Sequence, residues 1–452
     1  MEKKELQHIE SELLSKLAGK INLLQEDEEK EKIVLDVLSE VCGFIEKDAL
    51  LNQIKALSTE EERKQFTKDF LSFGVVAELL GDPYIEDIII NALNPIFVHH
   101  SEKGLIKTQF KFESEKELDL FIKKLVIFSG RSELRRINNF ELPNIQGRVN
   151  IILSPLGPQI TITKAKSEPL SVIDLIEKSS LNYDLAAQLW MYLEGFSVRP
   201  ANIIISGGPG SGKTTLLNAL FSFVPSNERM VIIEDTLELN TQFEESCSRL
   251  ESDEHVDLTE LVKNSLRMRP DRIIIGEVRG AEAKDLMTAV NIGKNCMGTI
   301  HASTPREAII RMQNEPMNVP EILVGLVDVF VIMKKFAVKD KVYRVVEELV
   351  ETGGMEKKTV LLSQVWKYDY DQNIIQQVSP STIYRDKLSR SSGIEPLRII
   401  EEVKIRSKIL QLLHKKNITT MKEVTTFCRA YNADPDGTLS GLGVKREELL
   451  KD

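Results

Sequence analysis

The chain has 452 residues, of which 42% are hydrophobic and 28% are charged, and this composition is typical of soluble globular proteins with roughly two to four domains. The net charge of −10 argues against a protein whose main task is to bind nucleic-acid backbones. The cysteines lack paired spacing, which excludes a disulfide framework or a four-cysteine zinc site and fits a reducing compartment. They are Cys42, Cys247, Cys296 and Cys428.

The beginning of the chain, MEKKELQHIE, is too polar for a secretory signal peptide. The most apolar late stretch, residues 322–333, contains Asp328 and is too short to span a bilayer of about 30 Å. We therefore expect a cytoplasmic protein that contacts a membrane only through a partner.

Changes in periodicity along the chain predict six segments. Two helical ends flank a small α+β domain, a linker with a helix, a larger domain with a parallel sheet and crossover helices, and a β meander. In chain order, the boundaries are 1–73 (helical), 74–166 (α+β), 167–200 (linker and helix), 201–340 (α/β), 341–379 (meander) and 380–452 (helical).

A glycine-rich loop lies between an apolar strand and a helix at ANIIISGGPGSGKTTLLNAL. Its glycines let backbone N–H groups turn inward and cradle phosphate oxygens, and the helix that follows adds its positive N-terminal end. Lys213 is expected to reach the β and γ phosphates, and the Thr214 hydroxyl to ligate Mg²⁺. We therefore predict a site for ATP and Mg²⁺. Its nucleotide-binding residues are Gly207, Gly208, Pro209, Gly210, Ser211, Gly212, Lys213, Thr214 and Thr215.

Two further apolar runs end in acidic residues: MVIIED ends in Glu234 and Asp235, and RIIIGE ends in Glu277. In open α/β sheets ligands bind beyond the carboxyl ends of the strands, where the glycine-rich loop also lies. Glu277 is therefore predicted to polarise the attacking water, and Glu234 to support Mg²⁺ or that water. Asp235 could converge on the same ATP, and a solvated or helix-capping acid is the alternative. Asp271 precedes Glu277 by about 20 Å of extended strand and is not expected to contribute.

Another apolar run, CMGTI, ends in His301. The same reasoning about strand ends places His301 near the γ-phosphate, where it could sense the state of the nucleotide. An incidental position at a strand end is the alternative for an isolated histidine. His99 and His100 have no comparable context, and we expect them at the surface.

Four segments follow one another in a fixed order: SGGPGSGKTT, VIIEDTLEL, RMRPDRIIIGEVRG and MGTIHAST. In this order the chain resembles the secretion-system traffic ATPases, which drive type II secretion, type IV pili, archaeal pili and archaella, and type IV secretion. The resemblance covers roughly residues 79–333, and the wording NIGK and PMNVP is most similar to archaeal pilus or archaellum members. It implies a hexamer in which an amino-terminal domain and a RecA-like domain sandwich ATP.

The resemblance also assigns roles to single residues. It makes Glu234 the acidic residue of the Asp box and Glu277 the Walker B glutamate, and it places Thr299 and His301 in the His box. The run NIGKNCMGTIH, however, lacks the first histidine that family members often carry there.

Two arginines are candidates for binding the γ-phosphate by the same resemblance: Arg148 in GRVN, and Arg131 in SGR. From the residues alone, these arginines show only that positive charge is available to stabilise a transferring phosphoryl group, and surface salt bridges are the alternative. Thr163 stands in ITITK where an arginine is common, and paired CxxC motifs, typical of the zinc-bearing bacterial branch, are missing from the sequence.

The predicted fold is α/β, with a RecA-like P-loop domain preceded by a smaller α+β domain and flanked by helical termini. The predicted function is that of a homohexameric ATP hydrolase at the inner face of the cell membrane. It would power assembly of a type IV pilus-like or archaellum filament, or a related secretion process, through a polytopic membrane platform protein.

Two alternatives stay open. One is a nucleotide-dependent scaffold or switch with little turnover, for which Thr163 and the missing histidine leave room. The other is a RecA-like nucleic-acid motor, because one fold serves many functions. The acidic composition and the missing aromatic–basic platform argue against that motor, so we expect no nucleic-acid partner.

Overall fold

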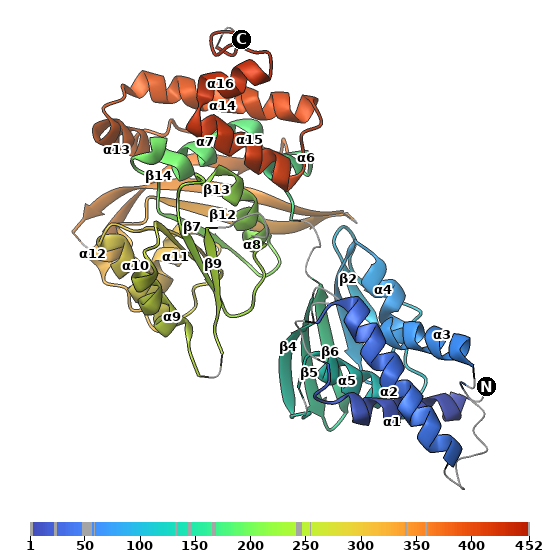
Figure 1. Ribbon diagram of the computed structural model, residues 1–452. Helices are drawn as coiled ribbons and strands as arrows, with labels where there is room; N and C mark the ends of the chain where they lie inside the picture. Colours follow the sequence, from blue (N-terminus) through green and yellow to red (C-terminus); the bar gives the residue numbers. More distant parts are fainter. Residues whose placement is uncertain are drawn as a thin grey trace. The chain divides into compact units, whose positions relative to one another are not determined.

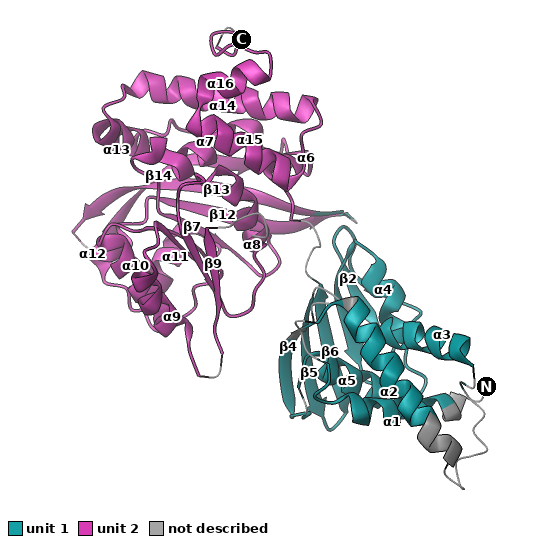
Figure 2. Ribbon diagram, viewed as in Figure 1, with its two compact units in different colours: residues 1–167, 339–342 teal, residues 168–338, 343–452 magenta. Residues whose placement is uncertain are grey.

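The computed structural model describes residues 3–21, 25–47, 57, 59–131, 133–142, 147–164, 169–240, 246–253, 255–339, 341–357 and 359–450. The chain forms two compact units (Figure 2). Unit 1 comprises Met1–Ser167 and Lys339–Val342, and unit 2 comprises Glu168–Val338 and Tyr343–Asp452. The first two residues of the predicted linker, 167 and 168, lie outside the described residues.

Unit 1 combines helices with a six-stranded antiparallel sheet in the order β3-β2-β1-β6-β5-β4 (Figure 1). The strands are β1 (Ile85–Asn91), β2 (Phe97–His100), β3 (Gly104–Lys107), β4 (Ile137–Leu142), β5 (Gly147–Ser154) and β6 (Gly157–Lys164). The helices are α1 (Lys3–Leu17), α2 (Asp27–Lys47), α3 (Glu60–Leu71), α4 (Ala77–Gly81) and α5 (Glu115–Phe128). Apolar residues at helical spacing in α1 and α5, and at alternate positions in β5, bury one face of each element in a shared core.

Unit 2 is built on a nine-stranded sheet in the order β15-β14-β13-β12-β7-β11-β10-β8-β9 (Figure 1). Strands β12, β7, β11, β10, β8 and β9 are parallel, whereas β13, β14 and β15 pair in antiparallel fashion. The segment predicted as a separate meander therefore continues the main sheet. The strands are β7 (Ile203–Gly207), β8 (Met230–Glu234), β9 (Cys247–Glu251), β10 (Arg272–Ile275), β11 (Asn295–Ile300), β12 (Val329–Val338), β13 (Lys341–Glu356), β14 (Thr359–Asp369) and β15 (Ile374–Gln377).

Helices cover both faces of this sheet (Figure 1). Ile203 and Ile205 of β7 pack into one core with α7, α8, α14 and α15, while Ile204 between them packs into a second core with α9, α10 and α11. Strands buried on both faces read as continuous apolar runs, which is the pattern of the sequence here. The helices are α6 (Val172–Glu177), α7 (Tyr183–Glu194), α8 (Lys213–Leu220), α9 (Leu258–Ser265), α10 (Glu282–Asn291), α11 (Pro305–Gln313), α12 (Glu321–Val324), α13 (Ile383–Ser392), α14 (Pro396–Lys415), α15 (Met421–Ala433) and α16 (Pro435–Gly441).

A buried arginine joins the C-terminal helices to α7. Arg406 of α14 donates to Glu194 at 2.8 Å and to Glu402 at 3.0 Å, and its guanidinium lies 5.0 Å from the ring centre of Trp190. Both carboxylates are also buried, and Arg446 pairs with Glu402 as well. Removal of Arg406 would therefore leave Glu194 as the buried charge without its ion-pair partner. In the described part of the chain, none of the helices is both long and apolar enough to cross a membrane.

Unit 1 contains a buried lysine, Lys124 of α5, only 4% exposed. Its Nζ lies 4.5 Å from the ring centre of Phe70 and 5.1 Å from that of Phe73. Burial lowers the pKa of Lys124 to about 8, although the charge of Glu10 acts in the opposite direction. The charged form of Lys124 is therefore less stable in the folded protein than in water.

We expect Lys124→Met to raise the free energy of unfolding of unit 1 by about 1–3 kcal/mol at pH 7, because methionine keeps the contacts with the rings and needs no charge in the core. Between pH 8 and 10.5 the unfolded chain binds more protons than the folded one, so wild-type stability rises with pH and the advantage of methionine shrinks. Thermal unfolding at pH 7 and pH 10 measures both effects. Lys123→Met, at the exposed neighbouring position, is the control. A less stable Lys124→Met protein would mean that the cation–ring contacts outweigh the cost of burial.

Candidate active site

The register of the parallel strands brings four predicted residues to one edge of the sheet. Ser206 pairs with Ile300, Gly298 with Ile275, and Ile275 with Ile233. Gly207, His301, Glu277 and Glu234 therefore end adjacent strands, or follow them by one or two residues, at their carboxyl ends. The predicted residues lie around a common point because the register fixes where each strand stops.

The glycine-rich loop joins β7 to α8 and packs closely against β12. A Cβ at Gly207 would lie 2.4 Å from the carbonyl oxygen of Met333, so this position excludes a side chain. Gly210 and Gly212 have φ values of 65° and 94°, which favour glycine. Gly212 is the N-cap of α8, and Lys213, Thr214 and Thr215 form its first turn. Gly208, Pro209 and the buried Ser211 complete the loop.

Lys213, His301 and Glu277 form a chain of polar contacts beside the loop. The Lys213 ammonium donates to the Gly208 carbonyl at 3.2 Å and lies 3.2 Å from Nδ1 of His301. Nε2 of the same imidazole lies 2.9 Å from Oε1 of Glu277. An ammonium can only donate, so Nδ1 accepts and the neutral imidazole carries its proton on Nε2, facing the carboxylate. Burial and the charge of Lys213 lower the pKa of His301 despite Glu277, in agreement with a neutral ring.

Arg279 holds the other oxygen of Glu277. Its Nη2 donates to Oε2 at 2.7 Å, and its Nη1 lies 3.5 Å from Asp235. Burial would raise the pKa of Glu277, but the hydrogen bond and charge of Arg279, together with the charge of Lys213, outweigh it and leave the pKa below its ordinary value. Glu277 is therefore ionised at neutral pH. Sequence reasoning gave Arg279 no role, although its place two residues after Glu277 in GEVRG was a signal.

Glu234 lies at the end of β8 with a buried carboxylate. Its Oε1 accepts hydrogen bonds from the backbone N–H groups of Glu238 and Leu239, both at 3.0 Å, and its Oε2 lies 3.6 Å from Arg249. Burial raises the pKa of Glu234 to about 7, although these hydrogen bonds and the arginine charge oppose the shift. Neighbouring Asp235 is exposed and accepts a hydrogen bond from Ser252 at 2.8 Å. The two adjacent acids therefore have different environments.

The predicted Mg²⁺ ligands, Thr214 and Glu234, have the chemistry that this ion prefers, since both offer oxygen atoms. Oε2 of Glu234 has no hydrogen-bond partner in the described structure and can act as a ligand, directly or through water. Within the described ranges, no three His, Cys, Asp or Glu residues form a metal-binding group of their own. The donor set therefore fits an ion whose remaining ligands are phosphate oxygens and water.

The predicted arginines, Arg131 and Arg148, lie in unit 1, whereas the P-loop lies in unit 2. Arg131 donates to the carbonyl oxygen of Asn139 at 2.8 Å, and Arg148 lies in β5 opposite Thr163 of β6. The Thr163 hydroxyl donates to Asp87 at 2.7 Å, so it completes a contact within unit 1. The roles of Arg131 and Arg148 stay predictions.

In unit 2, Thr299 donates to the carbonyl oxygen of Gly276 at 2.7 Å and thus ties β11 to the segment that carries Glu277.

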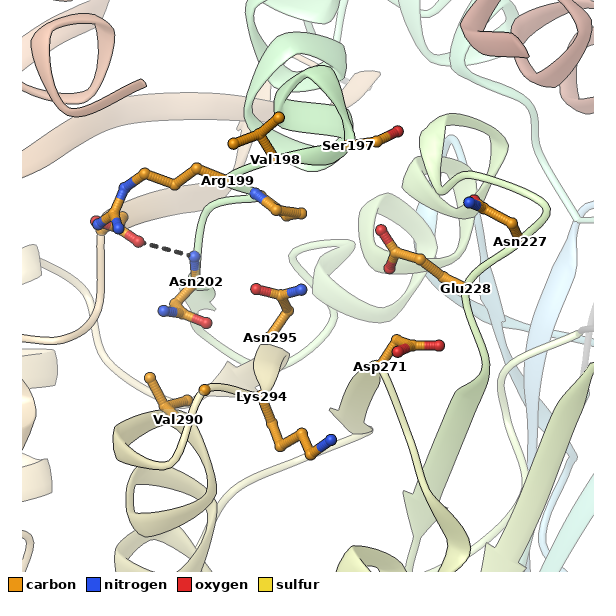
Figure 3. Close-up of a pocket in the computed structure, with 13 residues that line it drawn as sticks. Ser197, Val198, Arg199, Asn202, Asn227, Glu228, Asp271, Val290, Lys294 and Asn295 are labelled. Atoms are coloured by element: carbon orange, nitrogen blue, oxygen red, sulfur yellow. Dashed lines mark hydrogen bonds and ion pairs between the residues drawn. The ribbon is translucent and has the colours of Figure 1, made fainter. Parts of the chain in front are cut away.

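A separate cavity of about 440 Å³ lies at the opposite edge of the sheet of unit 2 (Figure 3). Its lining includes Asn202, Asp271, Asn295 and Asp328, which stand at or before the amino ends of parallel strands. Asp328 is already paired with Lys387 at 2.9 Å and accepts a hydrogen bond from the Asn202 backbone at 3.1 Å. The acid is therefore satisfied within the protein, and we place the active site at the P-loop edge instead.

Comparison with known proteins gives related sequences along most of the chain. The model of the family described as type II/IV secretion system protein matches residues 70–424. An uncharacterized protein of Methanocaldococcus jannaschii is 31% identical over 410 residues, which are 86% of this chain and 73% of that protein. The conjugal transfer protein TrbB of Rhizobium radiobacter is 31% identical over 240 residues, or 52% of this chain and 73% of TrbB. Among solved structures, the Legionella pneumophila ATPase DotB is 19% identical, with 86% of this chain and 94% of DotB covered and a TM-score of 0.46.

We expect Gly276→Ala to displace Glu234, because a Cβ at position 276 would lie 2.8 Å from Cγ of that residue. The resulting strain should lower the free energy of unfolding by about 1–3 kcal/mol. Thermal unfolding against Gly441→Ala tests this, since a Cβ at Gly441 meets no atom within 4 Å. An unchanged melting temperature in Gly276→Ala would show that Glu234 adapts without cost.

Proposed function

Because the chain belongs to the type II/IV secretion system protein family, we propose that it hydrolyses ATP at the P-loop edge of unit 2. The chemical energy would drive movement in a secretion or filament-assembly machine. The observation that carries the proposal is the ionised Glu277, which lies at a strand end and is linked through His301 to the P-loop lysine.

The contacts in the structure suggest how the residues act. The backbone N–H groups of the P-loop bind the phosphates, and Lys213 exchanges its contacts with Gly208 and His301 for the β and γ phosphates. Glu277 then orients the attacking water and accepts its proton. Mg²⁺, held by Thr214 and Glu234, would supply Lewis-acid stabilisation of the phosphate charge.

The position of His301 suggests how the site could report whether a nucleotide is bound. Its imidazole lies between Lys213 and Glu277, so any movement of the lysine toward the γ-phosphate changes the environment of the carboxylate. This position supports the proposed role of His301 in reporting the nucleotide state. The arginines Arg131 and Arg148 are proposed to stabilise the transferring phosphoryl group, on the resemblance of their motifs alone.

The larger assembly is proposed by resemblance to the family. It comprises a homohexamer with RecA-like units and a membrane platform protein that transmits the work to a pilus-like or archaellum filament, or to a related secretion process. Cytoplasmic operation at the inner membrane face follows from the same resemblance. The similarity to the conjugal transfer protein TrbB supports a link to transfer machinery without specifying the cargo of this chain.

Two substitutions separate binding from turnover. Lys213→Ala should weaken ATP binding by about 10-fold or more, because it removes a charge-assisted contact to the phosphates. Glu277→Gln should keep ATP bound but reduce kcat by about 100-fold or more, because the amide keeps the shape and loses the base. Fluorescent-nucleotide binding and phosphate release, measured with Mg²⁺ and with oligomer mass in the same samples, provide the readouts.

Glu401→Gln serves as a control, since that acid is exposed on α14. Equal loss of binding in Lys213→Ala and Glu277→Gln would contradict the role given to Glu277. Stable ATP binding without turnover in the wild type would instead support a nucleotide-dependent switch. Hydrolysis stimulated by DNA with a steep salt dependence would support the nucleic-acid motor.

A further inference from the structure

The P-loop is flanked by two cations that the motifs do not contain. Arg344 of β13 donates through Nε to the carbonyl oxygen of Gly210 at 2.9 Å. Lys335 of β12 approaches the same glycine, since its Nζ lies 3.6 Å from where a Cβ at position 210 would be. Both side chains are partly exposed. The loop is thus bordered by positive charge on the side of β12 and β13.

The sheet order places these cations away from the proposed catalytic carboxylate. Strands β11 and β10, which precede His301 and Glu277, lie on one side of β7, and β12 and β13 lie on the other. If the γ-phosphate lies beside Glu277, the rest of the phosphate chain and the nucleoside leave the P-loop toward β12 and β13. Lys335 and Arg344 then border the nucleoside end of the ligand.

We propose that Lys335 and Arg344 bind the α-phosphate end of the nucleotide and hold ATP and ADP alike. The inference rests on the proposed function, because it assigns part of the same site. Ammonium and guanidinium groups form strong charge-assisted hydrogen bonds with phosphate oxygens. A guanidinium carries five N–H donors, so Arg344 can hold Gly210 and a phosphate oxygen at once. In the described part of the chain, Lys335 has no carboxylate within ion-pair distance, in contrast to Lys334, which lies 3.6 Å from Glu347.

The close packing of the loop on β12 supports this assignment. Met333, two residues before Lys335, lies opposite Gly207 in the register, and its backbone leaves no room for a side chain there. Met333 and Arg344 side chains also lie within 4.0 Å of the Cβ position of Gly212. The two strands thus contact the loop at its beginning and its end, which fixes the cations at its border.

The test compares ADP and ATP on the purified full chain. Lys335→Ala should weaken ADP binding about 10-fold and raise KM for ATP by a similar factor, while kcat changes less than about twofold. Equal losses for ADP and ATP are expected, because the contact is made to a part that both share. A loss for ATP alone would overturn the proposal, since it would place the lysine at the γ-phosphate.

Arg344→Gln separates ligand binding from support of the loop. Glutamine keeps a donor that can reach the Gly210 carbonyl but has no charge, so a purely structural arginine predicts wild-type ADP affinity in this variant. Our proposal predicts a loss of about 10-fold. Lys334→Ala, the adjacent lysine paired with Glu347, should bind ADP as the wild type does.

The outcomes also separate this inference from the proposed function. Wild-type ADP affinity in both Lys335→Ala and Arg344→Gln would overturn the inference and leave the hydrolysis proposal intact. A wild-type protein that binds neither ADP nor ATP would overturn both.

Discussion

The arrangement of the site depends on the parallel register of β8, β10, β11 and β7. Each of these strands stops at the same edge, and a residue at its end, or one or two positions beyond it, carries a functional group or opens the P-loop. A slip of one residue would turn alternate side chains to the other face and take them out of the site. The two helical layers prevent such a slip, because alternate β7 residues belong to different cores. The packing of the apolar strands therefore also determines where the polar groups of the site lie.

The site combines groups whose charges are balanced in different ways. Glu277 is surrounded by Arg279, Lys213 and His301, which keep it ionised, whereas Glu234 lies in a buried position that favours its neutral form near neutral pH. Two carboxylates in one site can thus perform different tasks because their environments separate their pKa values. Because a carboxylate that ligates a metal is deprotonated, Mg²⁺ at Glu234 would have to displace the proton that burial favours there.

Much of the α/β architecture could be predicted from the sequence, and the family resemblance read from the four motifs is confirmed by the match to residues 70–424. Apolar runs such as IIISG and RIIIG, alternating with helical segments, predicted a parallel sheet, and the positions of the polar residues at strand ends indicated which side chains meet. Arg279 was overlooked although it lies in the GEVRG motif, whereas Lys335 and Arg344 could not be given roles in this way. Lys335 and Arg344 lie far along the chain from Gly210, and only the neighbouring placement of β12 and β7 brings them to the loop.

Lys213 already has partners in this structure, the Gly208 carbonyl and the His301 ring. When a nucleotide binds, its phosphate oxygens therefore replace the Gly208 carbonyl and the His301 ring as acceptors for Lys213. The lysine contributes to the binding free energy only the difference between these two sets of contacts. When the ammonium leaves, the imidazole loses the cation that lowers its affinity for a proton, while Glu277 remains beside it. Occupancy of the loop would thus change the proton affinity of the His301 ring, which contacts Lys213 directly.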